Sequence, residues 1–503
     1  MKFEILTMKK HYLILALILL ATFIFRLPSL FEPFWYGDEG IFAAVASNLN
    51  QDGVLYQTAW DNKPPMIYLT YAAIFKLFGV SMFWLRLATL AVVLATAVAL
   101  YEIAKNILGE KRALFSTLIF GFLTSLRIIE GNLALTEIFM ILPISAAMMI
   151  VILRKFDPLS LFASGILFAV ASLYKQVGAF EIVALGIFLF LASENFGKFI
   201  KKGLTLSSGF LIPYLVTLGY FASKNLVGDY IFAAYTYYRI YLGESPKYAV
   251  LVNILKFSPI LAAVIYGWFK KVRGKTSVFD LLLLWTAFSF LGSYFSGRTY
   301  GHYLVQAIPP TSLLIASISF KPILKKAQVT FALFFFIPLI FLTKLLFTDF
   351  LSGGPINQIK YWQNFVAFSF GKKSIDDYNN FFDANVNSIM ALADFFNTQK
   401  KEKNVLGPQA EPRTASSAYI WGDYPWLYAI ADLKNPTRYV TSFHVFGTPT
   451  GKEEIAGALN ANPPEFIIKP ENSIGYFEGL EKILAKKYKI VGKIENSQVF
   501  EKK

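Results

Sequence analysis

Long apolar stretches separated by short polar or basic segments fill the chain up to residue 347. A membrane-spanning helix needs about 20 predominantly apolar residues. Eleven stretches approach that length, near 11–30, 83–104, 113–128, 133–153, 158–174, 177–193, 203–223, 250–269, 279–296, 303–320 and 327–347. The two weakest are 113–128, which is short, and 177–193, which contains Glu181. The pattern predicts an α-helical multi-span membrane protein.

The N-terminal segment has a basic start and an apolar stretch, as a signal peptide does. No small-residue cleavage site follows it, so we expect 11–30 to remain as the first span.

The pattern changes after residue 348, where hydropathy falls. Short strand-like runs at 418–421, 438–441, 466–469 and 488–492 alternate with helical patterns at 376–399, 452–460 and 476–486. Thr450 and Glu453 form a capping-box pattern before the second of these helices. Alternation of this kind predicts a small soluble α/β domain with a central sheet. The expected division is a transmembrane domain at 1–348, with a loop at 31–86, and a soluble domain at 349–503.

The composition supports the membrane class. Hydrophobic residues make up 55% of the chain and the mean hydropathy is +0.49, far more apolar than a soluble globular protein. The formal net charge is +15, but the basic residues stand in short clusters between apolar runs. They therefore orient spans, and the sequence argues against nucleic acid as a partner.

The basic clusters also predict the orientation. Alternating the spans across the bilayer places 18 basic residues in six short segments on one side: Lys2, Lys9, Lys10; Lys105, Lys111, Arg112; Arg154, Lys155; Lys198, Lys201, Lys202; Lys270, Lys271, Arg273, Lys275; Lys321, Lys325, Lys326. Positive charge marks the cytoplasmic side. The N-terminus is expected there, and the loop 31–86, the loop 224–249 and the C-terminal domain on the external side.

Cysteine is absent from the chain and there are three histidines. Disulfides, thiolate metal sites and a cysteine nucleophile are therefore excluded, and a histidine-rich zinc site is disfavoured. No cofactor is predicted with certainty. The carboxylates could still hold a hard divalent cation, so any metal ligands stay unknown.

The loop between the first two spans concentrates polar residues in an apolar chain. It holds the acids Asp38 and Glu39, then Gly53-x-x-Tyr56, Asn62-Lys63-Pro64-Pro65, Phe78-Gly79 and Arg86. The order and spacing resemble the first external loop of the GT-C-fold polyprenyl-phosphate-sugar glycosyltransferases, the family of the protein O-mannosyltransferases and the aminoarabinose transferases.

The resemblance implies roles for three residues of this loop. Asp38 is the expected general base that removes the acceptor proton, with Glu39 as the second acid of the catalytic pair. Lys63 matches the family lysine that binds the donor phosphate, which a lipid tail holds at the bilayer surface. The alternatives are that Asp38 caps a helix beginning at Glu39, and that Lys63 only contacts lipid headgroups.

Further candidates stand at the ends of later spans. Glu137 aligns with a second catalytic acid, which the family has as Asp. Glu130 is a second candidate for the same role, and the structural alternative is pairing with Arg127. Lys175 corresponds to a lysine that the family has near a glycine, here replaced by Gln176, and is a candidate phosphate ligand or an ordinary interfacial lysine.

One more polar group precedes the tenth span. Arg298, His302 and Tyr303 resemble the family's basic residue followed by tyrosine and a proline pair, which implies contact with the donor phosphate. An interfacial belt of aromatic and basic residues is the alternative.

These features together predict an inverting membrane glycosyltransferase. Its donor would be a sugar linked to a polyprenyl (dolichyl or undecaprenyl) phosphate, and its acceptor a protein, glycan or lipid at the external face of the cell membrane. The alternative is a transporter or flippase of lipid-linked sugars. Transporters place ionisable groups near the midplane, whereas these candidates stand at span ends.

Overall fold

The computed structural model describes residues 2–241, 249–298, 300–317, 326–346, 354–405, 417–471 and 475–503. The chain divides into two compact units. The first comprises Met1–Ser29, Arg86–Tyr220 and Glu244–Tyr361; the second comprises Leu30–Leu85, Phe221–Gly243 and Trp362–Lys503. The predicted boundary at 348 and the predicted basic residues Lys321 and Lys325 lie outside the described residues.

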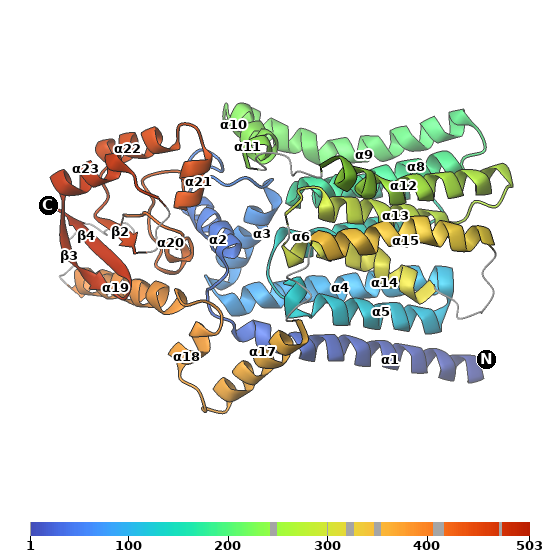
Figure 1. Ribbon diagram of the computed structural model, residues 1–503, viewed down its shortest axis with the longest axis horizontal. Coiled ribbons are helices and arrows are strands. Elements are labelled where there is room, and N and C mark those ends of the chain that lie inside the picture. Colours follow the sequence, from blue (N-terminus) through green and yellow to red (C-terminus); the bar gives the residue numbers. More distant parts are fainter. Residues whose placement is uncertain are drawn as a thin grey trace. The chain divides into compact units, whose positions relative to one another are not determined.

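The first unit is a bundle of helices that run side by side (Figure 1). Each of the eleven predicted stretches contains a helix. The elements are α1 (Lys2–Arg26), α4 (Met82–Leu108), α5 (Glu110–Thr124), η2 (Arg127–Ile129), α6 (Thr136–Leu153), α7 (Pro158–Tyr174), η3 (Gln176–Ala179), α8 (Phe180–Ala192), α9 (Phe196–Ser223), α12 (Ala249–Val272), α13 (Val278–Tyr294), η5 (Gly301–Ala307), α14 (Ile308–Ser317) and α15 (Lys326–Leu346). α17 (Gly354–Ser369) leads from this unit into the second.

Five helical segments in the described part are long and apolar enough to cross a membrane: Lys10–Phe31, Met82–Leu108, Thr136–Leu153, Phe196–Ser223 and Leu251–Val272. Others are apolar but shorter, such as Pro158–Tyr174 and Val278–Tyr294. Large apolar side chains stay exposed on this unit, among them Val216 on α9 (68%) and Ile254 on α12 (60%). Such surface is unfavourable in water and suits a lipid environment. The predicted multi-pass helical fold is confirmed.

The structure explains how the stretch 177–193 accommodates its charged residue, Glu181. Glu181, in the first turn of α8, is fully buried. Its carboxylate accepts hydrogen bonds from Ser289 Oγ at 2.8 Å and from Gln306 Nε2 at 2.9 Å. A buried acid is tolerated among apolar helices when its oxygens are satisfied in this way.

The second unit contains a four-stranded sheet of order β1-β2-β4-β3, built from β1 (Ala418–Ile420), β2 (Phe466–Pro470), β3 (Tyr488–Ile494) and β4 (Ser497–Lys502). β1 and β2 are parallel and the other pairs antiparallel. Figure 1 shows α19 (Val386–Val405) along one side of the sheet, and α22 (Gly451–Ala461) with α23 (Glu478–Lys487) along the other. The predicted C-terminal α/β domain is confirmed.

Several local predictions for this unit are wrong. Residues 438–441 form no strand; Tyr439 makes a single bridge with Trp60. Strand β4 was not predicted, and the helix expected over 376–399 is two helices, α18 (Ile375–Asn380) and α19. Thr450 is the N-cap of α22 but makes no capping hydrogen bond, because its hydroxyl donates to Glu454 at 2.6 Å.

The loop between the first two spans is a folded part of this second unit, joined to the C-terminal residues. It forms α2 (Gly37–Asn50) and α3 (Met66–Phe78). α2 packs against α20 (Trp426–Ile430), where Gly40 permits a close approach: a Cβ there would lie 2.8 Å from Trp426 Cδ1. The Trp426 indole donates a hydrogen bond to Tyr36 O at 3.0 Å.

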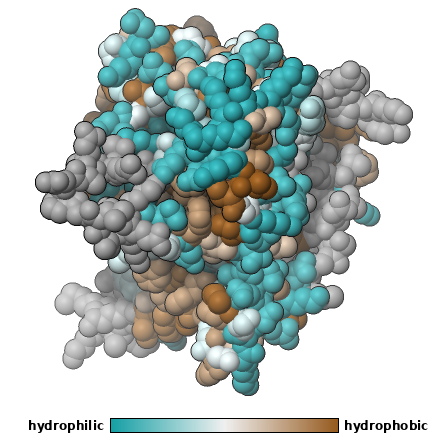
Figure 2. Space-filling model, turned by 90° about the vertical axis from the view of Figure 1, so that its left-hand side faces the viewer, coloured by the Kyte–Doolittle hydropathy of each residue, from teal (hydrophilic) through white to brown (hydrophobic). Residues whose placement is uncertain are grey.

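Residues 221–243 complete the second unit, with α10 (Val227–Ile231), a π-helical turn η4 (Phe232–Thr236) and α11 (Tyr238–Tyr241). Tyr237 from this segment packs edge-on against Trp60, with ring centroids 4.9 Å apart. α21 (Ser442–Gly447) also contacts this indole, through the His444 ring. The face drawn in Figure 2 is mostly hydrophilic, with a smaller apolar area near its centre.

Candidate active site

Five predicted site residues come together in the first unit. Glu137 lies in the first turn of α6, Lys175 directly follows α7, and Arg298, His302 and Tyr303 lie between α13 and α14. The opposite ends of these helices carry basic residues such as Lys155 after α6 and Lys270 before α13. The bundle therefore has one acid-rich, mixed-charge end and one basic end.

An ion pair forms the centre of this cluster. Lys175 Nζ bonds Glu137 Oε1, and Thr136 Oγ1 donates to Glu137 Oε2 at 2.7 Å. The Glu137 side chain is 2% exposed and the Lys175 side chain 11% exposed. The Lys175 ammonium also lies 3.6 Å from the centroid of the Tyr303 ring, a cation–π contact. The lysine is therefore held in one position by an acid and an aromatic face.

His302 pairs with the other predicted acid. Its Nδ1 lies 2.6 Å from Glu130 Oε2, and its backbone N–H donates to the same oxygen at 3.3 Å. The His302 Nε2 is 3.9 Å from Glu137 Oε1. Gly301 lies so close to Ile128 O that a side chain there has no room. That close approach places His302 against the segment carrying Glu130.

Two buried arginines fix this segment. Arg26 donates to Thr124 O at 2.7 Å and to Gly131 O at 2.8 Å. Arg86, part of the loop pattern in the sequence, donates to Asn132 O at 3.1 Å. Both side chains are nearly fully buried. They satisfy the carbonyls of a turn that leads into α6 and so position Glu130 and Glu137.

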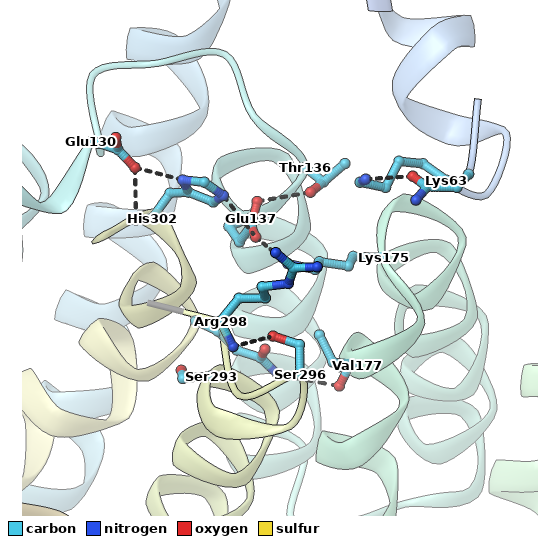
Figure 3. Close-up of polar contacts among 12 residues, drawn as sticks. Lys63, Glu130, Thr136, Glu137, Lys175, Val177, Ser293, Ser296, Arg298 and His302 are labelled. Carbon is cyan, nitrogen blue, oxygen red and sulfur yellow. Dashed lines mark hydrogen bonds and ion pairs between the residues drawn. The ribbon is translucent and has the colours of Figure 1, made fainter. Parts of the chain in front are cut away.

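Arg298 is half-buried, and its side chain extends toward Glu137 and Lys175 (Figure 3). Its backbone N–H donates to Ser296 Oγ at 3.3 Å. A guanidinium beside an ammonium makes this end of the bundle a place where an anion can be bound by two cations.

The remaining predicted residues, Asp38, Glu39 and Lys63, belong to the second unit. The alternative that Asp38 caps a helix is wrong, because α2 begins at Gly37 and its N-cap is Tyr36, with no side-chain capping bond. Asp38 is half-buried and Glu39 fully buried. Both acids lie in the first turn of α2, where the helix dipole favours negative charge.

Lys63 lies in a turn held by two tyrosines. Tyr56 Oη donates to Lys63 O at 2.7 Å, and Lys63 N donates to Tyr68 Oη at 3.2 Å. The Lys63 ammonium donates to Asn62 Oδ1 at 2.7 Å. Lys63 is half-buried, so its ammonium has a defined position and some access to solvent.

Sequence reasoning missed the residues that support this turn. Asp61 accepts a hydrogen bond from Tyr68 Oη at 2.7 Å and lies 3.3 Å from His444 Nε2. Burial raises the pKa of Tyr68 well above its usual value, which keeps the phenol a donor. Asp61 and His444 are too far apart in the chain for any local pattern to connect them.

The Trp421-Gly422-Asp423-Tyr424 segment is a packed core element in this unit. Trp421 is 1% exposed and lies against Phe446 and Phe477. Asp423 accepts from Phe443 N and Ser442 Oγ, each at 3.4 Å. Burial raises the pKa of Asp423 above its usual value.

Across the described ranges, no three His, Asp or Glu side chains gather in a way that could hold a metal ion.

Comparison with known proteins matches this architecture. Residues 62–220 match the model of the family described as dolichyl-phosphate-mannose-protein mannosyltransferase. The structure of ArnT from Cupriavidus metallidurans bound to undecaprenyl phosphate superposes with a TM-score of 0.56 at 14% identity, over 96% of this chain and 97% of that one. The predicted resemblance to the GT-C transferases is confirmed.

Two further matches extend over much of this GT-C-like chain. The apo structure of the same ArnT gives a TM-score of 0.55 at 14% identity, covering 96% of this chain and 97% of that chain. An uncharacterized protein of Aquifex aeolicus is 25% identical over 337 residues, 64% of this chain and 66% of its own length. These matches show a multi-pass membrane fold shared with the GT-C transferases, together with a family match over residues 62–220.

Proposed function

We propose that this protein transfers one sugar from a polyprenyl-phosphate carrier to a hydroxyl acceptor at the external face of the cell membrane. The observation that carries the proposal is the end of the helical bundle at which Lys175, Glu137 and Tyr303 meet. It provides a fixed cation at the end of the bundle opposite the basic residues that follow α6 and precede α13. The family match over residues 62–220 and the undecaprenyl phosphate named with ArnT support a lipid phosphate as its ligand.

Lys175 and Arg298 are the residues we assign to the donor phosphate in the first unit. A phosphate oxygen that approaches Lys175 can share its ammonium with Glu137, since an ammonium has three donors. Glu137 thus keeps the lysine aimed, because its second oxygen is already held by Thr136. Lys63 is the donor-phosphate candidate of the second unit. A cation beside the phosphate offsets the negative charge that develops as the phosphate leaves.

Asp38 is assigned as the general base. The acceptor hydroxyl oxygen attacks the anomeric carbon from the face opposite the phosphate, and its proton passes to the Asp38 carboxylate. The bond between that carbon and the phosphate oxygen breaks, and its electron pair stays on the phosphate. The configuration at the anomeric carbon inverts. The half-buried position of Asp38 and the lack of a capping role leave its carboxylate suited to this step.

The test is a transfer reaction with purified protein in lipid nanodiscs. A panel of polyprenyl-phosphate sugars is offered with hydroxyl acceptors, and mass spectrometry follows free polyprenyl phosphate and the glycosylated product together. We expect one donor sugar to give both products in equal amounts, with an inverted linkage by NMR. Surface glycans and glycoproteins of a deletion strain then show which sugar disappears. Lack of product with every donor that the deletion strain identifies would refute the proposal.

A transporter of lipid-linked sugars is the second candidate. A transporter would move the intact lipid-linked sugar across a vesicle bilayer without releasing free polyprenyl phosphate. The same panel reconstituted in vesicles therefore separates the two functions.

A further inference from the structure

The turn that carries Lys63 is held from both sides by residues remote in sequence. Trp60, just before it, is fully buried, and its backbone N–H donates to Arg438 O at 2.8 Å. The Trp60 indole packs against Tyr237, Tyr439 and the His444 ring, the last edge-on with centroids 5.1 Å apart. The loop and the C-terminal segment therefore share one core at this point.

Asp61 is the polar centre of that core. It is 2% exposed, and its two oxygens have different partners: Tyr68 Oη at 2.7 Å and His444 Nε2 at 3.3 Å. A carboxylate accepts protons and does not donate them, so a proton on Nε2 of His444 is the one that Asp61 stabilises. The contact with Asp61 thus favours the Nε2–H tautomer of His444.

The other ring nitrogen of His444 is unusual. His444 is 3% exposed, and its Nδ1 has no hydrogen-bond partner among the described residues. An unsatisfied buried acceptor costs free energy, so a histidine that served packing alone would be a poor choice here. Such a side chain is a candidate for a role in the reaction that the adjacent turn carries out.

The charges around His444 come from every segment packed on it. Burial lowers the pKa of His444; Asp61, Asp38 and Asp423 oppose that shift, and Lys63 adds to it. The imidazole is therefore neutral near pH 7 and lies in the combined field of the proposed base and the proposed phosphate ligand. Protonation of His444 would change the electrostatic potential at both Asp38 and Lys63.

We propose that His444 is a positioning residue of the transfer reaction: its contact with Asp61, made through Nε2, holds the Asp61–Lys63 turn in the orientation that binds the donor phosphate. This inference rests on the proposed function and deepens it. It gives the C-terminal domain a direct part in the active centre, through a histidine that acts by way of Asp61 and does not touch the substrate.

Two substitutions separate this role from plain packing. In His444→Gln the side-chain amide reaches the place of Nε2 and can still donate to Asp61 without titrating. In His444→Leu the volume is kept and the donor is lost. We expect His444→Leu to raise the apparent KM for the lipid donor about 10-fold or more, since the lost bond ends on a charged group. His444→Gln should stay within about threefold of the parent at pH 7.5, because a neutral donor remains.

The split between KM and kcat gives a readout that a general loss of packing does not produce. His444→Leu should raise the donor KM with kcat unchanged, and His444→Gln should restore the donor KM. Val445→Ala, on the same short helix and 1% exposed, tests packing alone. His11→Gln, a histidine on α1 paired with Glu110, is the matched control and should leave KM and kcat unchanged.

Each outcome decides the question. A donor KM for His444→Leu equal to that of the parent overturns the positioning role, as does an equal loss in His444→Gln and Val445→Ala. A fall in kcat alone, with the donor KM unchanged, also overturns it. Failure of the proposed function looks different, because the parent itself would then release no polyprenyl phosphate with any donor.

Discussion

The ion pair between Glu137 and Lys175 gives the sharpest energetic prediction. Lys175→Met leaves the Glu137 carboxylate with its side chain 2% exposed and without its cation. Breaking one side of a buried pair costs about 3 to 5 kcal/mol. Glu137→Gln leaves the ammonium against the Tyr303 ring, which retains about 2 kcal/mol of attraction, so its cost should be smaller. The double variant buries no isolated charge. Its cost in unfolding free energy should therefore differ from the sum of the two single costs by about 2 kcal/mol, which is the interaction energy of the pair.

The assay is denaturant unfolding of the parent, the two single variants and the double variant in mixed micelles. Lys198→Met is the matched control, because Lys198 pairs with Glu194 on the surface, with side chains 56% and 77% exposed. Exposed pairs contribute about 0 to 1 kcal/mol, so this control should unfold like the parent. Binding of polyprenyl phosphate, measured on the same samples, should weaken in Lys175→Met more than in Glu137→Gln.

Two results would refute the reasoning. One is a cost for Lys175→Met no larger than that for Lys198→Met, which would mean that the pair is solvated. The other is additivity of the two single changes, which would mean that Glu137 and Lys175 do not interact in the folded protein.

Four further predictions follow from the assigned roles and the environments of these groups. Asp38→Asn should keep its fold by circular dichroism and lower turnover by about 100- to 10,000-fold, the range for loss of a general base; near-parental turnover would exclude Asp38. Lys63→Ala should raise the donor KM with little change in unfolding temperature, and an unchanged KM would remove its phosphate role. In intact cells, an impermeant thiol reagent should label a cysteine placed at Lys482 and should not label a cysteine placed at Arg273. Labelling of both would contradict the topology. Folding holds the pKa of His444 below its ordinary value of 6.5, so its contribution to stability is complete above that pH and is lost as the pH falls toward the folded pKa; the parent should therefore lose more thermal stability between pH 7 and pH 5 than His444→Gln, and equal losses would contradict the burial of a neutral imidazole.

The membrane helices were predictable because one physical rule produces them. Lipid forces backbone groups to pair within a helix, so apolar length alone gives the eleven stretches. Glu181 illustrates the limit of that rule. Its partners Ser289 and Gln306 lie on other helices, and no local pattern shows that they satisfy it.

The C-terminal unit was harder to predict because its elements depend on distant contacts. Residues 438–441 have the composition of a strand, but they form no strand, and Tyr439 makes only an isolated bridge with Trp60. The contact between Asp61 and His444, which lies next to the Lys63 turn, also joins residues far apart in the chain. Family motifs pointed to Glu137, Lys175 and His302 as candidate site residues, whereas the pairing of His302 with Glu130 required the fold.

The bridge between Trp60 and Tyr439 has a consequence for biosynthesis. A ribosome that has just added Trp60 must still make about 380 residues before Tyr439, the bridge partner, exists. At about 5 to 20 residues per second, Trp60 therefore spends roughly 20 to 80 s without Tyr439 and His444, which complete its core. A nascent chain in that interval exposes aromatic surface, which makes it a client for holdase chaperones. Early truncation should therefore yield a protease-sensitive fragment, even though every helix before the stop is complete.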